Sequence, residues 1–320
     1  MNRLSYIFGI ALTVLTLSAC ATAPLSQIQD PISHFDQATH TAANSESAFL
    51  NAVQTVDCEA QFYKTAYEYS LQKKKSNFDL TGYCKPEVIT SEQIDTRNKL
   101  MSAIVLYADK MQALATSDDN KQLDANSQTL AENLNKLASS GGIKLKDPAI
   151  VQGVETAVIA IADMALDRVK YSTIRSAAQS MQPHLNTVVT ALKSENIGFG
   201  MAMNDSLGQI EITMRTLIAD LQKKDQEPIE TFFDIINSRN LIISADPLTK
   251  RSLALPANTP IANPLDIAKP INDALDAVVS CNQAIANPKT GSGGIYAAAE
   301  DLFKRAIVAK DIYNSIASAK

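Results

Sequence analysis

Histidine, the side chain best suited to proton transfer and metal binding near neutral pH, occurs three times in the 320 residues. Asp36 and His40 lie four residues apart, so they share a face of any helix formed there, and His34 is nearby. The group could form a weak metal site, but its place beside the N-terminal segment favours a solvated stretch. His184 follows a proline and has no acidic neighbour in sequence. We therefore expect no metal site and no cofactor.

Serine and lysine recur in three short motifs: Ser70-Leu71-Gln72-Lys73, Ser194-Glu195-Asn196 and Lys289-Thr290-Gly291. In this order they resemble the three motifs of penicillin-binding proteins and serine β-lactamases. The resemblance implies that Ser70 would be the nucleophile and that Lys73 would activate it. It also implies that Ser194 would assist proton transfer and that the third motif would bind the substrate carboxylate.

The surroundings of these motifs do not fit that family. Its first motif opens a buried helix, whereas Ser70 and Lys73 stand where a helical pattern closes. Its third motif lies on an inner strand, whereas here it follows Asn287-Pro288 and leads into an alanine-rich helical pattern. We expect no catalytic residues and a protein that is not an enzyme. A penicillin-interacting serine enzyme stays a minor alternative.

Two further patterns have ordinary structural explanations. The glycine-rich loop at 291–294 precedes a predicted helix and could hold a phosphate, but it lacks a preceding strand and the spacing of nucleotide-binding loops. Asp163 and Asp167 lie four residues apart on the most apolar predicted helix. Burial there would raise their pKa values. We expect instead that both lie on an exposed polar strip.

The N-terminus has the order of features of an exported protein. Arg3 is followed by the apolar run Tyr6 to Leu17, which is too short for an ordinary membrane-spanning helix. The run ends in Leu17-Ser18-Ala19-Cys20, which resembles the lipobox of bacterial lipoproteins. The resemblance implies cleavage before Cys20 and acylation of Cys20, for example with palmitate, so that the chain is anchored to lipid. A plain secretory signal peptide is the alternative.

The residue after Cys20 bears on which membrane holds the anchor. In the Gram-negative pattern of these lipoproteins an Asp at this position favours retention at the inner membrane, whereas this chain has Ala21. The resemblance therefore implies the outer membrane. We find no later stretch long and apolar enough to span a bilayer.

Lipidation of Cys20 would leave three cysteines, Cys58, Cys84 and Cys281. Export allows a disulfide, and we favour Cys58–Cys84, the pair closest in sequence. The bridge would hold the loop around Cys84 against the preceding helix and stabilise the fold by about 3 kcal/mol. Cys281 would be left over, either buried or available to a partner. No cysteine spacing here is typical of a metal site.

Composition indicates a folded acidic protein. The hydrophobic fraction is 46%, the charged fraction is 20% and the net charge is −5. This charge argues against a nucleic-acid partner, since such proteins usually have a basic face.

Apolar residues recur at helical spacing along most of the chain, and no alternating strand pattern stands out. Gln93 completes a capping box with Thr90, Asp147-Pro148 and Pro270 begin helices, and Gly141-Gly142 ends one. Pro183 should end or kink a helix, and Gly198 and Gly200 should separate two. About eight helices are predicted, covering approximately residues 35–75, 91–116, 123–140, 148–178 or beyond, 204–224, 228–236, 270–286 and 295–317.

These signals predict an all-α fold, an elongated up-and-down bundle or two fused bundles. We expect a signal peptide over 1–19, a lipid-anchored tether over 20–33, and helical subdomains over 34–145 and 146–320.

The function we favour is a non-enzymatic, lipid-anchored scaffold or docking protein of the bacterial cell envelope, with an envelope protein as partner. The alternative is a binder or carrier of a small hydrophobic ligand, with a pocket lined by Phe62, Tyr63, Tyr67 and Tyr69.

Overall fold

The computed structural model describes residues 25–72, 84–116, 125–145, 147–166, 173–222, 245–246, 251–252, 267–287 and 291–318. Within these residues the fold is all-α, as the sequence predicts, with seven packed helices. The helices are α2 (Leu25–Gln72), α3 (Ser91–Ala115), α4 (Ala125–Ser139), α5 (Pro148–Leu166), α6 (Ile174–Gln222), α8 (Lys269–Ala286) and α9 (Ser292–Ser318). The antiparallel pair β1 (Ala245–Asp246) and β2 (Arg251–Ser252) has two residues on each side. The helix expected at 228–236 lies outside the described residues.

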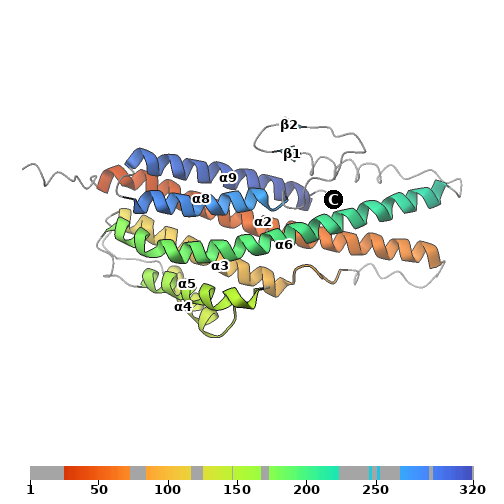
Figure 1. Ribbon diagram of the computed structural model, residues 1–320, viewed down its shortest axis with the longest axis horizontal. Coiled ribbons are helices and arrows are strands. Elements are labelled where there is room, and N and C mark those ends of the chain that lie inside the picture. Colours follow the sequence, from red (N-terminus) through yellow and green to blue (C-terminus); the bar gives the residue numbers. More distant parts are fainter. Residues whose placement is uncertain are drawn as a thin grey trace, which may run out of the picture.

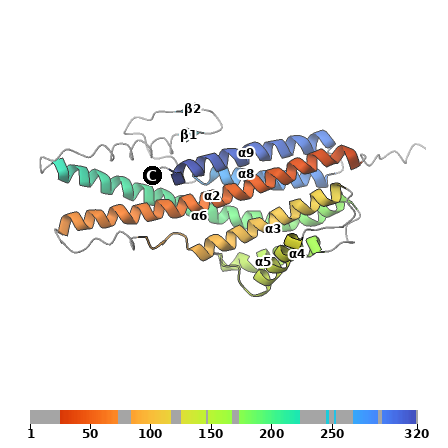
Figure 2. The same ribbon diagram turned by 180° about the vertical axis from the view of Figure 1, so that it is seen from behind.

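The molecule is elongated because two of its helices are very long (Figure 1). Helix α2 has 48 residues and α6 has 49, so at 1.5 Å per residue each is about 72–74 Å long. The C-terminal parts of both helices continue past the ends of α3, α8 and α9. The shorter pair α4 and α5 covers one side, where α5 packs against α3 and α6 (Figure 2).

Helix α2 is the central helix of the bundle, because it packs against α3, α6, α8 and α9. Its most extensive interface is with α9, and the two helices run parallel: His34 meets Tyr296, Ser45 meets Ala306 and Phe49 meets Tyr313. The backbones come close there, since Ser45 Oγ donates to the carbonyl of Ala306 at 2.6 Å. The parallel direction follows from α8, which runs back along the bundle before α9 starts.

Most of the expected helix boundaries are confirmed. Thr90 and Gln93 form both hydrogen bonds of the capping box that begins α3. The Asp147 carboxylate accepts from the backbone N–H of Ala149 at the start of α5. Gly141 adopts a φ of 63° after α4, a conformation that glycine reaches without strain.

The expected tether over 20–33 is wrong from residue 25 onward, because α2 begins at Leu25 and contains Pro31. Ile28, Ile32 and Phe35 lie on one side of this first part of α2, and Ile32 and Phe35 are fully buried. Burial of this stripe stabilises the helix by more than the hydrogen bond that Pro31 cannot make.

Two expected breaks in the middle of the chain are also wrong: Pro183 does not end a helix, and Gly198 and Gly200 do not separate two helices. Helix α5 ends at Leu166, and a new helix, α6, begins at Ile174 and continues through Pro183, Gly198 and Gly200 to Gln222. Thr173 caps the start of α6, since its hydroxyl accepts from the N–H of Ser176. The continuous buried stripe of α6 stabilises the helix across its proline and glycines; the stripe contains Leu185, Val188, Leu192, Phe199, Met203 and Leu207.

The expected division at residues 145 and 146 does not separate two cores. Buried side chains from both sides of it form one cluster, and α2 from the first half packs against α6, α8 and α9 from the second.

Helix α5 is the one described helix that is long and apolar enough to cross a membrane by length and composition, which corrects the expectation that no such stretch exists. A core helix of a folded domain has the same properties, and Val154, Val158 and Ile161 of α5 are buried within the protein.

Candidate functional site

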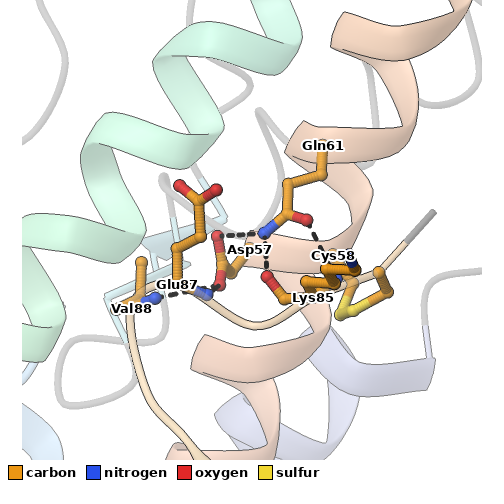
Figure 3. Close-up of a disulfide and its surroundings, with 7 residues drawn as sticks. Asp57, Cys58, Gln61, Lys85, Glu87 and Val88 are labelled. Carbon is orange, nitrogen blue, oxygen red and sulfur yellow. Dashed lines mark hydrogen bonds between the residues drawn. A yellow bond between two sulfur atoms is a disulfide. The ribbon is translucent and has the colours of Figure 1, made fainter. Parts of the chain in front are cut away.

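The structure joins Cys58 of α2 to Cys84, which lies just before α3, as a disulfide (Figure 3). Their Cα atoms are 4.9 Å apart, within the usual range for disulfides. The Asp57 carboxylate accepts from the backbone N–H groups of Glu87 at 2.7 Å and Val88 at 3.0 Å. One turn of α2 therefore holds the start of the 84–90 segment both covalently and through hydrogen bonds.

Gln61 adds two hydrogen bonds to the same attachment. Its amide donates to the Lys85 carbonyl at 2.8 Å and its Oε1 accepts from the Lys85 N–H at 3.1 Å. The backbone of Lys85 is thus satisfied by a side chain of α2, as Figure 3 shows.

A central polar cluster, formed by Glu46, Arg97, Glu195 and Asn196, lies buried where α2, α3 and α6 meet. Arg97 pairs with Glu195, its Nη1 donates to the Gln93 carbonyl at 2.8 Å, and its guanidinium carbon lies 4.6 Å from the ring centroid of Phe199. Asn196 Nδ2 donates to Glu46 Oε2 at 2.9 Å. These contacts fix how the three helices sit against one another.

Burial changes the acid–base properties of this cluster. It raises the pKa of Glu46 to about 7, although Asn196 and Arg97 act in the opposite direction. It also lowers the pKa of Arg97 to about 10, against the attraction of Glu46. Glu46 Oε1 accepts no hydrogen bond. Glu46 is therefore a buried carboxyl group that changes charge near neutral pH.

An acid–histidine cluster, formed by Asp36 and His40 of α2 and Asp109 of α3, lies nearer the N-terminal end of α2. His40 Nε2 is 2.9 Å from Asp109 Oδ1 and 3.9 Å from Asp36 Oδ1. Burial and the neighbouring Asp109 raise the pKa of Asp36 to about 6, while His40 acts in the opposite direction. Two carboxylates and an imidazole, groups that bind metal ions, thus come together.

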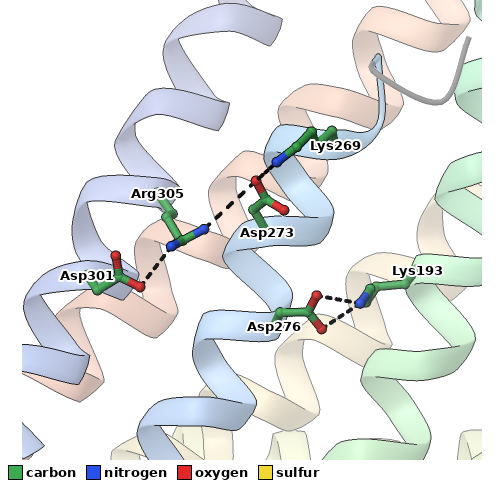
Figure 4. A network of polar contacts seen from close by, with 6 residues as sticks. All are labelled: Lys193, Lys269, Asp273, Asp276, Asp301 and Arg305. Carbon is green, nitrogen blue, oxygen red and sulfur yellow. Dashed lines mark hydrogen bonds and ion pairs between the residues drawn. The ribbon is translucent and has the colours of Figure 1, made fainter. Parts of the chain in front are cut away.

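Ion pairs on the surface connect α6, α8 and α9 (Figure 4). Lys193 of α6 binds Asp276 of α8 at 2.5 Å. Arg305 of α9 lies 3.8 Å from Asp273 of α8 and 2.8 Å from Asp301. Solvent screens such pairs, so they contribute little stability and mainly favour one arrangement of the three helices.

The described residues of the three serine and lysine motifs do not meet in space, and Lys73, Lys289 and Thr290 lie outside the described residues. Gly291, the last residue of the third motif, directly precedes α9, and Tyr296 near that start contacts His34. Ser70 lies 36 residues beyond His34 on α2, about 54 Å away. Ser194 lies on an exposed part of α6 beside the buried Glu195. Ser70, Ser194 and Gly291, the described residues that represent the three motifs, therefore do not form one serine-enzyme site.

The other residues singled out in the sequence make ordinary structural contacts. His34 stacks edge-on against Tyr296, and burial lowers the pKa of His184. Asp163 is exposed, as expected, and accepts from Asn135, whereas Asp167 lies outside the described residues.

The aromatic residues suggested for a ligand pocket lie on the C-terminal part of α2. The rings of Phe62 and Tyr63 contact each other, and Tyr63 packs against the core. The side chain of Tyr69 lies outside the described part. These contacts are those of ordinary aromatic packing.

Sequence reasoning brought Asp36 and His40 together but missed Asp109, and it missed the central polar cluster altogether. Asp109 is 69 residues from His40, and nothing in the local pattern links them. Arg97 and Glu195 stand in helical stretches where charged residues are expected at the surface. One signal could have indicated that Arg97 is buried. Arg97 lies three residues before Leu100, so it shares a helix face with an apolar residue.

The comparisons with protein families, curated proteins and solved structures found no match to this chain.

Proposed function

We propose that this protein is a lipid-anchored scaffold or docking protein of the bacterial cell envelope, attached to the outer membrane through acylated Cys20. The observation that carries the proposal is the position of α2 relative to Cys20. Helix α2 begins at Leu25, five residues after Cys20, and then continues for 48 residues. An acyl anchor on Cys20 would therefore attach the membrane to one end of a rod about 72 Å long.

The disulfide supports a location outside the cytoplasm. Disulfides persist in oxidising compartments such as the periplasm and are rare in the cytosol. The pairing of Cys58 with Cys84 therefore agrees with the export signal that precedes Cys20.

The end of the rod far from Cys20 supports a role in docking. There α2 and α6 extend past α3, α8 and α9. On this part of α6, Ile212 is exposed by 68%. Ile197 and Met201, exposed by 37% and 48%, lie about four and three turns before Ile212, next to the central polar cluster. Exposed apolar residues along one helix face are typical of surfaces that bind another protein.

The experiment is site-specific photocrosslinking in living cells. A photoreactive amino acid replaces Ile212 at the far end or Asp30 at the end near Cys20, and both positions are exposed. We expect one envelope protein to crosslink at position 212 and not at position 30. We also expect this crosslink to be lost in Cys20→Ser, which keeps the folded domain and removes the anchor.

Two results would contradict the proposal. One is the absence of any specific crosslink from either end of the rod. The other is a crosslink that persists at full yield in Cys20→Ser, because the partner would then not depend on membrane anchoring.

A further inference from the structure

The acid–histidine cluster brings ligand-type atoms from two helices to one point. Asp36 and His40 are one turn apart on α2, and Asp109 faces them from the antiparallel helix α3. The His40 nitrogen and one oxygen of each carboxylate all lie within 4.8 Å of one another. Ligands about 2.0–2.2 Å from a tetrahedral zinc ion stand about 3.3–3.6 Å apart. The two distances from His40, 2.9 and 3.9 Å, lie on either side of this value.

The cluster has more negative charge and more acceptor atoms than its own partners satisfy. Asp36 Oδ1 is buried and accepts no hydrogen bond. Its carboxylate lies beside that of Asp109, and the two repel each other when both are ionised. A divalent cation would balance both charges and satisfy the buried oxygen, leaving His40 neutral as a ligand.

We propose that Asp36, His40 and Asp109 bind a divalent transition-metal ion, and that zinc is the ion this ligand set fits best. An imidazole nitrogen with two carboxylate oxygens suits a borderline ion, since imidazole favours zinc over magnesium or calcium. Three protein ligands leave the fourth tetrahedral position to water or to a group from another molecule. The side chain of His40 is 50% exposed, so the ion can enter from solvent.

The bound ion would connect α2 to α3 near the N-terminal end of α2, far from the disulfide that attaches the 84–90 segment to α2. Metal that binds only the folded chain stabilises it by mass action. This inference is independent of the proposed scaffold function, because it rests on side chains that the lipid anchor does not involve.

The test is calorimetric titration of Zn²⁺ into the full chain, purified in detergent without a histidine tag and treated with chelator. We expect one ion per chain and a rise in unfolding temperature on adding zinc. Asp36→Asn, His40→Ala and Asp109→Asn should each weaken binding at least tenfold. His34→Ala is the matched control on the same helix and should bind like the wild type.

The proposal is overturned if the wild-type chain binds no zinc, because the cluster would then be only an ion-paired group of side chains. It is equally overturned if His40→Ala and Asp36→Asn bind zinc as tightly as the wild type. Circular dichroism of each variant separates loss of a ligand from loss of the fold. Asp36→Asn is the safest variant in this respect, since it removes a repulsive charge.

Discussion

The buried carboxyl group of Glu46 makes the stability of this fold depend on pH. Its pKa is about 7 in the folded state against 4.5 in the unfolded chain, so the folded state keeps a proton that the unfolded state has released. The stabilisation from this proton is complete below about pH 4.5. It is lost as the pH rises to 7, and the loss amounts to at most about 3 kcal/mol.

We therefore predict that Glu46→Gln reduces the loss of stability between pH 5 and pH 8. The neutral amide can still accept a hydrogen bond from Asn196, and it carries no charge whose burial would destabilise the folded state. The measurement is urea unfolding of both proteins at several pH values. Glu92→Gln, at an exposed side chain that pairs with Lys144, is the matched control and should keep the wild-type pH dependence. An unchanged slope in Glu46→Gln would refute the assignment.

Arg97 should be difficult to replace, because it is the cation that balances a buried acid. Arg97→Met would leave Glu195 buried without its charge partner, and we expect a loss of about 3–5 kcal/mol in the free energy of unfolding. Adding Glu195→Gln to this variant should recover part of the loss. If the double variant were no more stable than the single one, the pair would not be the main interaction of Arg97.

At the scale of elements, the disulfide should stabilise the attachment of the 84–90 segment to α2. The double variant Cys58→Ser, Cys84→Ser should lose about 3 kcal/mol, the chain-entropy value for a loop of this length. Reductant should lower the stability of the wild type to that of the double variant and should not change the double variant. A wild type that is insensitive to reductant, yet more stable than the double variant, would contradict this account.

The parallel packing of α2 and α9 depends on small residues at their closest approach. Ala306→Leu inserts three carbon atoms at the place where Ser45 contacts the α9 backbone, and we expect a loss of about 1–3 kcal/mol. Ile307→Leu, at the next and partly exposed position, should change stability by less than about 0.5 kcal/mol. Thermal unfolding of the two variants makes the comparison. Equal effects would show that the helices are not closely packed there.

The signals that could be read from the sequence are local ones. The capping box at Thr90, the pair Asp147-Pro148 and the glycine at position 141 all mark real helix ends, because each acts within a few residues. Thr90 and Asp147 accept from backbone N–H groups of the first turn, and Gly141 adopts the positive φ that follows α4. Pro31 and Pro183 do not mark helix ends, because apolar stripes on either side of them are buried by other helices. That burial depends on tertiary neighbours, which the local pattern does not contain.

The candidate sites show the same limit. The spacing of Asp36 and His40 is visible in the sequence, but their contact with Asp109 depends on the register between α2 and α3. The central polar cluster likewise depends on three helices that lie far apart in sequence.

In the molecule as a whole, the long central helix α2 links the anchor position, the two polar clusters and the disulfide. Helix α2, which runs the length of the molecule (Figure 2), begins five residues after Cys20, contributes Asp36, His40 and Glu46 to the two polar clusters, and holds the disulfide in its C-terminal half. An anchored rod of this kind would hold its far end well away from the bilayer surface, where another envelope protein could bind.

The measurement that tests this account most directly is the intact mass of the protein extracted from the membranes of bacterial cells. We predict a chain that begins at Cys20 and carries additional mass equal to its acyl groups. The Cys20→Ser variant should not yield this acylated species. A chain that begins elsewhere, or one that begins at Cys20 without acyl groups, would contradict the lipid anchor and with it the proposed function.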